Sequence, residues 1–183
     1  MNKVFSILFF VLIISIGLFQ YIRNSEPSIN YERFNLVSPG VLRTPDDRFE
    51  DLKDYPFTPN YLTIGDTRIH YIDEGPKDGQ IVYLLHGEPT WSYLFRKMIP
   101  TLVNEGFRVI APDMVGFGKS DKYISTDDYS HQMHVEKMTQ LIVELDLKNI
   151  TAHFHDWGGP VGFRVLAEEP NRFDRVIATN TSL

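Results

Sequence analysis

The stretch that decides the fold is HFHDWGG, which runs from His153 to Gly159. An apolar, β-prone run from Ile150 to Phe154 leads almost directly into Asp156, two glycines follow closely, and a helical pattern begins at Pro160. A strand that turns abruptly into a helix presents the turn residue at the carboxyl edge of the sheet, where the helix begins. This is the geometry of a nucleophile elbow, with Asp156 where the usual G-x-S-x-G elbow carries serine.

Outward from the elbow, short apolar runs alternate with helical patterns. After an initial hairpin, this order is typical of an α/β fold with a mostly parallel sheet. The predicted hairpin joins Tyr61–Ile64 to Thr67–Ile72. The other predicted strands are Ile81–Leu85, Arg108–Ala111, Ile150–Phe154 and Arg175–Thr179. Helices are predicted over Tyr93–Val103, from a cap at Asp127 or Asp128 to Leu145, and over Pro160–Ala167.

Three loops follow predicted strands and carry the chemistry. His86-Gly87-Glu88-Pro89 follows Ile81–Leu85, the glycine-rich segment Asp113–Asp121 follows Arg108–Ala111, and the elbow is the third. In an open α/β sheet, ligands bind outside the carboxyl ends of the strands. The three loops therefore predict one site at that edge.

Composition excludes several other classes. The 183 residues are 43% apolar, which is enough for the core of one ordinary domain. The net charge of -6, without a basic stripe, argues against nucleic acid as a partner. The chain has no cysteine, which excludes disulfides, thiolate catalysis and cysteine-bound metal.

The N-terminus differs from the rest of the chain. Val4–Ile22 is almost entirely apolar, and as a helix it would span about 28 Å, close to one bilayer core. We expect a transmembrane anchor in residues 1–23, a polar tether in residues 24–40, and an exported, membrane-anchored domain. A cleaved signal segment, which would release a secreted protein, and a buried core helix are the alternatives.

Residues 41–183 resemble the α/β-hydrolase family and, within it, the haloalkane dehalogenases. The resemblance rests on HGEPTWSYLFRKMIP (His86–Pro100), RVIAPDMVGFGKSDK (Arg108–Lys122) and HDWGG (His155–Gly159). Glu88 matches the subfamily with glutamate after His-Gly, where other dehalogenases carry asparagine. The resemblance implies an α/β-hydrolase core that converts a small haloalkane to an alcohol and a halide ion, without a metal or organic cofactor.

Asp156 suits this chemistry as a nucleophile. A carboxylate can displace a leaving group from a saturated carbon, and water can then hydrolyse the resulting alkyl ester at the aspartyl carbonyl. Backbone N–H groups at the start of the following helix stabilise its charge. A simple helix-capping role would not explain Trp157-Gly158-Gly159 or the partner loops.

Two residues are expected to stabilise charge near Asp156. The indole N–H of Trp157 is a donor that can bind the departing halide, as the family resemblance also implies. The resemblance further implies that the backbone N–H groups of Trp157 and Glu88 form the oxyanion hole. The Glu88 carboxylate must be turned away, protonated, or paired with Arg96 or Lys97, because it would repel the nucleophile.

The remaining motif residues are assigned structural roles: His86, Gly87, Pro89, His155 and Gly158. His86 is expected to hold its loop by hydrogen bonds, and His155 to point to the other side of the strand. Four other histidines have no recognisable partner in the sequence, and no metal site is expected. They are His70, His131, His134 and His153.

No histidine follows Asp156. In α/β-hydrolases the chain order is nucleophile, acid, histidine. We therefore expect residues 41–183 to be the N-terminal part of a longer enzyme, inactive alone, whose base, acid and cap domain lie beyond Leu183. Two alternatives stay open: an epoxide hydrolase, and a non-catalytic, membrane-anchored binding module with the same scaffold.

Overall fold

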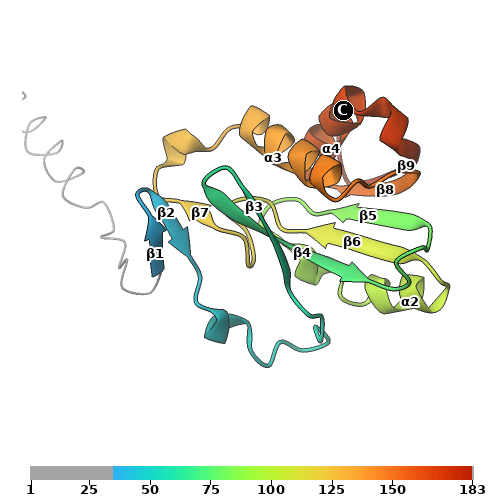
Figure 1. The fold of residues 1–183 in the computed structure, drawn as a ribbon, viewed down its shortest axis with the longest axis horizontal. Helices are drawn as coiled ribbons and strands as arrows, with labels where there is room; N and C mark the ends of the chain where they lie inside the picture. Colours follow the sequence, from blue (N-terminus) through green and yellow to red (C-terminus); the bar gives the residue numbers. More distant parts are fainter. Residues whose placement is uncertain (1–34, 183) are drawn as a thin grey trace, which may run out of the picture. The chain divides into compact units, whose positions relative to one another are not determined.

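A computed structural model describes residues 35–182, which form a main six-stranded sheet and a separate three-stranded one (Figure 1). Two predictions lie outside the described residues: the anchor helix in residues 1–23 and the first part of the tether. Among the helices of the described part, none is long and apolar enough to cross a membrane.

The main sheet confirms the predicted hairpin and the mostly parallel arrangement. The first two pairings, β3–β4 and β4–β6, are antiparallel, and the other three are parallel. In spatial order the strands are β3 (Asn60–Ile64), β4 (Thr67–Glu74), β6 (Arg108–Pro112), β5 (Ile81–Leu85), β8 (Ile150–His155) and β9 (Phe173–Thr179).

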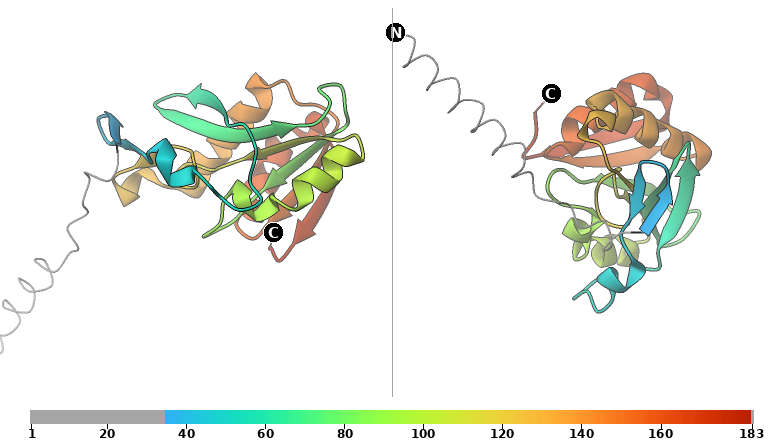
Figure 2. Two further views of the ribbon diagram at one scale, coloured as in Figure 1. Left: turned by 90° about the horizontal axis from the view of Figure 1, so that it is seen from below. Right: turned by 90° about the vertical axis from the view of Figure 1, so that its left-hand side faces the viewer.

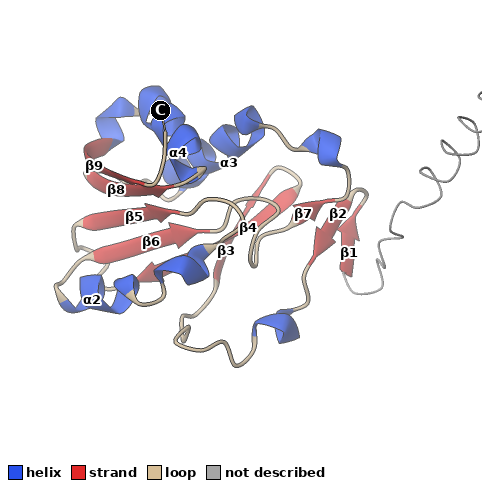
Figure 3. Ribbon diagram, turned by 180° about the vertical axis from the view of Figure 1, so that it is seen from behind, coloured by secondary structure: helices blue, strands red, loops and turns tan. Residues whose placement is uncertain are grey.

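Helices lie on both faces of this sheet, as Figures 1 and 3 show. The helices α3 (His131–Glu144) and α4 (Gly158–Glu168) pack on one face, and α2 (Met98–Asn104) with the 3-10 turn η3 (Ser92–Phe95) packs on the other. Because both faces are covered, a central strand must be apolar on both sides. In β5, Tyr83 and Leu85 face the α3–α4 core while Val82 and Leu84 face the opposite core.

Strand β8, which carries the elbow, has two different faces. Ile150, Ala152 and Phe154 are fully buried in the core under α3 and α4. The alternate residue His153 faces the other way, with its ring 5.8 Å from that of Phe95. Gly162 of α4 lies directly against the Phe154 ring, where a Cβ atom would overlap it. The glycine therefore allows α4 to pack tightly on the elbow strand.

The smaller sheet joins β1 (Asn35–Ser38), β2 (Val41–Arg43) and β7 (Lys122–Tyr123) in antiparallel pairs, at one end of the main sheet (Figure 2). Residues 35–38 were predicted to belong to the tether, so regular structure begins before Gly40. The amino-acid pattern does not predict this short strand, because its mostly exposed side chains do not alternate between apolar and polar.

Three helix predictions need correction at their starts. The expected single helix over Tyr93–Val103 is interrupted: η3 ends at Phe95 and α2 begins at Met98. Pro100 explains the break, because in a continuous helix its ring would clash with the carbonyl of Arg96, whereas proline is tolerated in the first turn of a helix.

The cap of α3 was also assigned to the wrong residue. Neither Asp127 nor Asp128 caps it; both lie in a 3-10 turn, and the Ser130 side chain accepts a hydrogen bond from the N–H of Met133 at 3.0 Å. The helix α4 begins at Gly158, two residues before the predicted Pro160.

Candidate active site

The three loops singled out in the sequence lie together at the carboxyl edge of the main sheet. They follow β5, β6 and β8, which are neighbours in the order β6-β5-β8. The chain passes from β5 to β6 on one side and then crosses to β8 on the other. This reversal creates the crevice where α/β sheets bind ligands.

Asp156 occupies the sharp turn between β8 and α4. Its φ of 53° lies in the left-handed region, which costs a non-glycine residue about 1–3 kcal/mol. Its N–H donates to the Thr179 carbonyl at 3.4 Å, and its own carbonyl accepts from the Gly159 N–H at 2.9 Å and the Thr181 hydroxyl at 2.6 Å. These contacts hold the strained turn in place.

Gly158 explains why the elbow sequence needs a glycine after Trp157. A Cβ atom there would overlap the carbonyl groups of Leu85 and His86 at the end of β5. The start of α4 therefore touches the neighbouring strand, and this contact places Asp156 beside the loop that begins at His86.

The carboxylate of Asp156 is held at one oxygen. The backbone N–H of Glu88 donates to Oδ1 at 2.8 Å, while Oδ2 accepts no hydrogen bond from residues 35–182. Gly87 packs against this group, since a Cβ atom there would overlap the Asp156 carboxylate and the Trp157 nitrogen. The loop thus orients one oxygen of the carboxylate, and the other has no hydrogen-bond partner in residues 35–182.

His86 links two of the three loops. Its ring is fully buried, and Nε2 accepts a hydrogen bond from the Met114 N–H at 3.0 Å. The other nitrogen, Nδ1, must then carry the proton, and it donates to the Gly87 carbonyl at 3.0 Å. Burial lowers the pKa of His86, which favours this neutral form.

Trp157 lies at the rim of a cavity of about 250 Å³. Its side chain is 53% exposed, and its indole N–H makes no hydrogen bond to any residue in the described range. The cavity walls are mainly apolar and include Met114, Phe117 and Val161. The arrangement offers a free N–H donor beside an apolar space.

The Glu88 side chain is exposed, and within residues 35–182 no lysine or arginine nitrogen lies within 4.0 Å of it. The pairing with Arg96 or Lys97 that was considered is therefore not formed. Arg96 stacks on the Tyr93 ring at 4.0 Å and donates to the Tyr93 carbonyl at 3.0 Å. Exposure to water keeps the carboxylate of Glu88 solvated instead.

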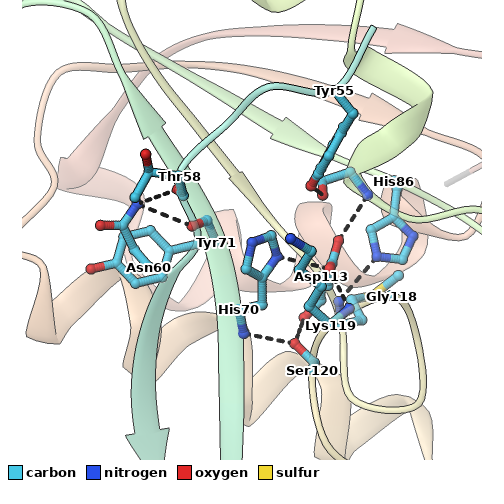
Figure 4. Close-up of polar contacts among 12 residues, drawn as sticks. Tyr55, Thr58, Asn60, His70, Tyr71, His86, Asp113, Gly118, Lys119 and Ser120 are labelled. Atoms are coloured by element: carbon cyan, nitrogen blue, oxygen red, sulfur yellow. Dashed lines mark hydrogen bonds and ion pairs between the residues drawn. The ribbon is translucent and has the colours of Figure 1, made fainter. Parts of the chain in front are cut away.

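His70 has a partner that the sequence did not reveal. Its Nδ1 lies 2.8 Å from Oδ2 of Asp113, and both side chains are buried (Figure 4). Burial alone would raise the pKa of Asp113, but the contact with His70 and the hydrogen bonds described next outweigh it and lower that pKa. The only sequence signal was a charged residue directly after a buried strand.

Asp113 holds three segments together. Its Oδ1 accepts from the Ser92 N–H and its Oδ2 from the Lys119 N–H, each at 2.8 Å, while the Ser120 hydroxyl donates to its carbonyl at 2.6 Å (Figure 4). The Ser92 hydroxyl in turn hydrogen-bonds to that of Tyr55. The loop that presents Glu88 is thus anchored at one end by His86 and at the other by Asp113.

None of the other histidines in residues 35–182 makes a hydrogen bond to the Asp156 side chain. His153 Nε2 is 2.9 Å from the Thr179 hydroxyl, and His155 Nδ1 is buried without a hydrogen bond in the described part of the chain. His134 lines the cavity, where burial lowers its pKa to about 4. No three His, Asp or Glu side chains of the described residues are grouped to hold a metal ion.

Comparison with known proteins places this geometry among hydrolases. The model of the family described as alpha/beta hydrolase fold matches residues 80–183. Haloalkane dehalogenases from Psychrobacter cryohalolentis and Mycolicibacterium paratuberculosis are 55% and 52% identical to this chain over 148 and 145 residues. Those matches cover 78% and 76% of this chain, but only 49% and 48% of the relatives.

A solved structure agrees with these matches. The tetrameric haloalkane dehalogenase DpaA from Paraglaciecola agarilytica is similar with a TM-score of 0.75 at 48% identity, covering 78% of this chain and 49% of that one. The chain therefore spans about half the length of the relatives that it matches.

Proposed function

The chain belongs to the α/β-hydrolase fold family, and on that premise we propose that the intact protein is a haloalkane dehalogenase. The similarity to dehalogenases at 48–55% identity supports the reaction class. The observation that carries the proposal is the state of the Asp156 carboxylate: the Glu88 N–H holds Oδ1, and Oδ2 accepts no hydrogen bond from residues 35–182. A serine elbow would instead favour acyl transfer from esters.

In the first step, Oδ2 of Asp156 attacks the carbon that bears the halogen. A carbon–oxygen bond forms, the carbon–halogen bond breaks, and the halide leaves with the bonding electron pair. The indole N–H of Trp157, which has no protein acceptor in residues 35–182, stabilises the departing anion. The apolar cavity beside it accommodates the alkyl chain.

In the second step, water attacks Cγ of the ester, and negative charge develops on Oδ1. The Glu88 N–H already lies 2.8 Å from this atom, and the Trp157 N–H is the second donor that we propose. The alkyl–oxygen pair leaves as the alcohol. Since the chain spans about half of its relatives, we propose that the base that takes the proton of water lies in the half not spanned.

Replacement of Asp156 by asparagine tests the proposal. The full-length D156N protein should release no halide from short haloalkanes such as 1-bromobutane, because a neutral amide is a far weaker nucleophile. Halide release is measured by ion chromatography. As a matched control, Asp174→Asn changes an exposed carboxylate on β9 and should leave turnover unchanged.

Three results would contradict the proposal. Normal halide release by the D156N protein would remove Asp156 as the nucleophile. If the parent protein hydrolyses styrene-type epoxides but not haloalkanes, the function is epoxide hydrolysis instead. If it turns over neither substrate, the scaffold is a non-catalytic binding module.

A further inference from the structure

Thr181 makes a contact to the elbow that neither the proposed reaction nor the sequence motifs use. It lies just beyond β9, and its hydroxyl donates to the carbonyl of Asp156 at 2.6 Å. The only other acceptor near this hydroxyl in the described residues is the Ser182 carbonyl, at 3.3 Å. Because a hydroxyl has one proton, the shorter contact is the one it makes.

The accepting carbonyl is connected to the oxyanion hole through the backbone. The Asp156 carbonyl and the Trp157 N–H belong to one peptide group, which is planar, so fixing one end fixes the direction of the other. A hydrogen bond to the carbonyl oxygen also polarises the peptide and strengthens its N–H as a donor. The hydroxyl of Thr181 therefore acts on the second proposed oxyanion donor.

The packing around Thr181 is tight enough to hold this geometry. A Cβ atom on Gly159 would overlap the Thr181 side chain, so the threonine lies directly on the first turn of α4. Two residues earlier, the Thr179 carbonyl accepts the Asp156 N–H. The last residue of β9 and the segment just beyond it thus contact both peptide groups that flank the proposed nucleophile.

We propose that Thr181 is a positioning residue whose hydroxyl orients and polarises the Asp156–Trp157 peptide for the hydrolytic half of the reaction. This inference rests on the proposed function. In the first step the attacking atom is Oδ2, and no new charge forms at Oδ1. In the second step an oxyanion forms at Oδ1, so a misdirected Trp157 N–H slows ester hydrolysis more than it slows alkylation.

The test separates the two steps in the full-length protein. Thr181→Val keeps the shape of the side chain and removes the hydroxyl. We expect kcat to fall about 10-fold, because about one hydrogen bond is lost in the ester-hydrolysis step. The value of kcat/KM for a haloalkane, which reports the alkylation step, should change less than about 2-fold. The alkylated enzyme should accumulate and appear in intact-mass spectra as an added alkyl group.

Rescue and control variants make the result specific. Thr181→Ser restores the hydroxyl and should return kcat to the parent value. Thr151→Val removes a hydroxyl at the opposite end of β8, whose one hydrogen bond within residues 35–182 is to the Gln80 side chain, and should leave both constants unchanged. In 15N-labelled protein, the Trp157 amide resonance should shift in Thr181→Val and return in Thr181→Ser, independently of activity.

The proposal is overturned if Thr181→Val has parent kinetics and an unshifted Trp157 amide. It is also overturned if kcat and kcat/KM fall together without rescue by serine, which would indicate a purely structural role. If Thr181→Val does not fold, the comparison is made with Thr181→Ala against Thr181→Ser. Failure of the Asp156→Asn test, by contrast, would concern the function itself and not Thr181.

Discussion

At the scale of single residues, the absence of a side chain at Gly87 positions Asp156, the nucleophile that we propose. This residue lies between β5 and the elbow, and its Cα faces both the Asp156 carboxylate and the Trp157 nitrogen. Any larger residue must displace one of them. Since Glu88 follows directly, such a displacement also moves the N–H that binds Oδ1.

We therefore predict that Gly87→Ala lowers halide release by the full-length enzyme by about 100-fold, because a shift of about 1 Å in a reacting group costs that much. The fold should survive, since the collision involves the active site and not the core. Activity is measured as halide release, and folding by circular dichroism.

Gly106→Ala is the opposite case. Nothing lies within 4 Å of an added methyl there, but the φ of 86° strains a side chain. It should reduce the free energy of unfolding by about 1 to 2 kcal/mol and leave turnover unchanged. Equal losses of activity in both variants would contradict the role given to Gly87.

At the scale of secondary structure, α3 shows how a helix start is chosen. Asp127, Asp128 and Ser130 are all suitable capping residues by type. The chain at 126–128 forms a 3-10 turn instead, and the Ser130 hydroxyl accepts the Met133 N–H. Burial of Val135, Met138, Leu141 and Ile142 sets where the apolar face of the helix must lie, and so where the helix can begin.

Ser130→Ala should lower the free energy of unfolding by about 1 kcal/mol, the usual cost of losing an N-cap. Asp128→Ala, which removes no cap, should change it by less than about 0.5 kcal/mol. Urea denaturation followed by circular dichroism measures both values. A larger loss in Asp128→Ala than in Ser130→Ala would show that the aspartate caps the helix in solution.

At the scale of the whole molecule, acid stability depends on histidines from several elements. Burial lowers the pKa of His86, His134 and His153, and that of His134 falls to about 4. In the unfolded chain, each of these histidines binds its proton near pH 6.5. Between about pH 6.5 and 4 the unfolded state therefore binds more protons than the folded state. The contribution of these neutral histidines to the free energy of unfolding is complete above pH 6.5 and is lost as the pH falls.

Asp113 acts at lower pH. Its pKa is lowered by His70 and by its hydrogen bonds, so its contribution is present above the ordinary carboxyl range and is lost only below it. Acid destabilisation should therefore begin in the histidine range, before the buried Asp113 network is protonated.

Replacement of His134 tests this account. His134→Leu keeps an apolar contact with Phe117 and Tyr129 and removes the titrating ring. We expect the loss of stability between pH 7.5 and pH 5 to shrink by about 1 kcal/mol, a value reduced for the partial exposure of the ring. Urea unfolding at pH 7.5 and at pH 5 measures both stabilities, and an unchanged loss in His134→Leu would contradict the account.

The sequence by itself determined the strands of the main sheet along the chain, the elbow at Asp156 and the three loops that meet there. These features depend on local periodicity and on which residue follows each strand, both of which can be read along the chain. The residues of the elbow and of the His86 loop are therefore adjacent in the structure as the sequence order implies.

Only the tertiary structure decided which distant side chains become partners. His70 and Asp113 are 43 residues apart, and Thr181 reaches back to Asp156 across 25 residues. Of the alternatives open for the Glu88 carboxylate, pairing with Arg96 or Lys97 is not formed. Such pairs depend on strand register and loop packing, because a buried polar group takes whichever donor or acceptor the surrounding fold brings within hydrogen-bond distance. Local sequence carries no signal for that choice.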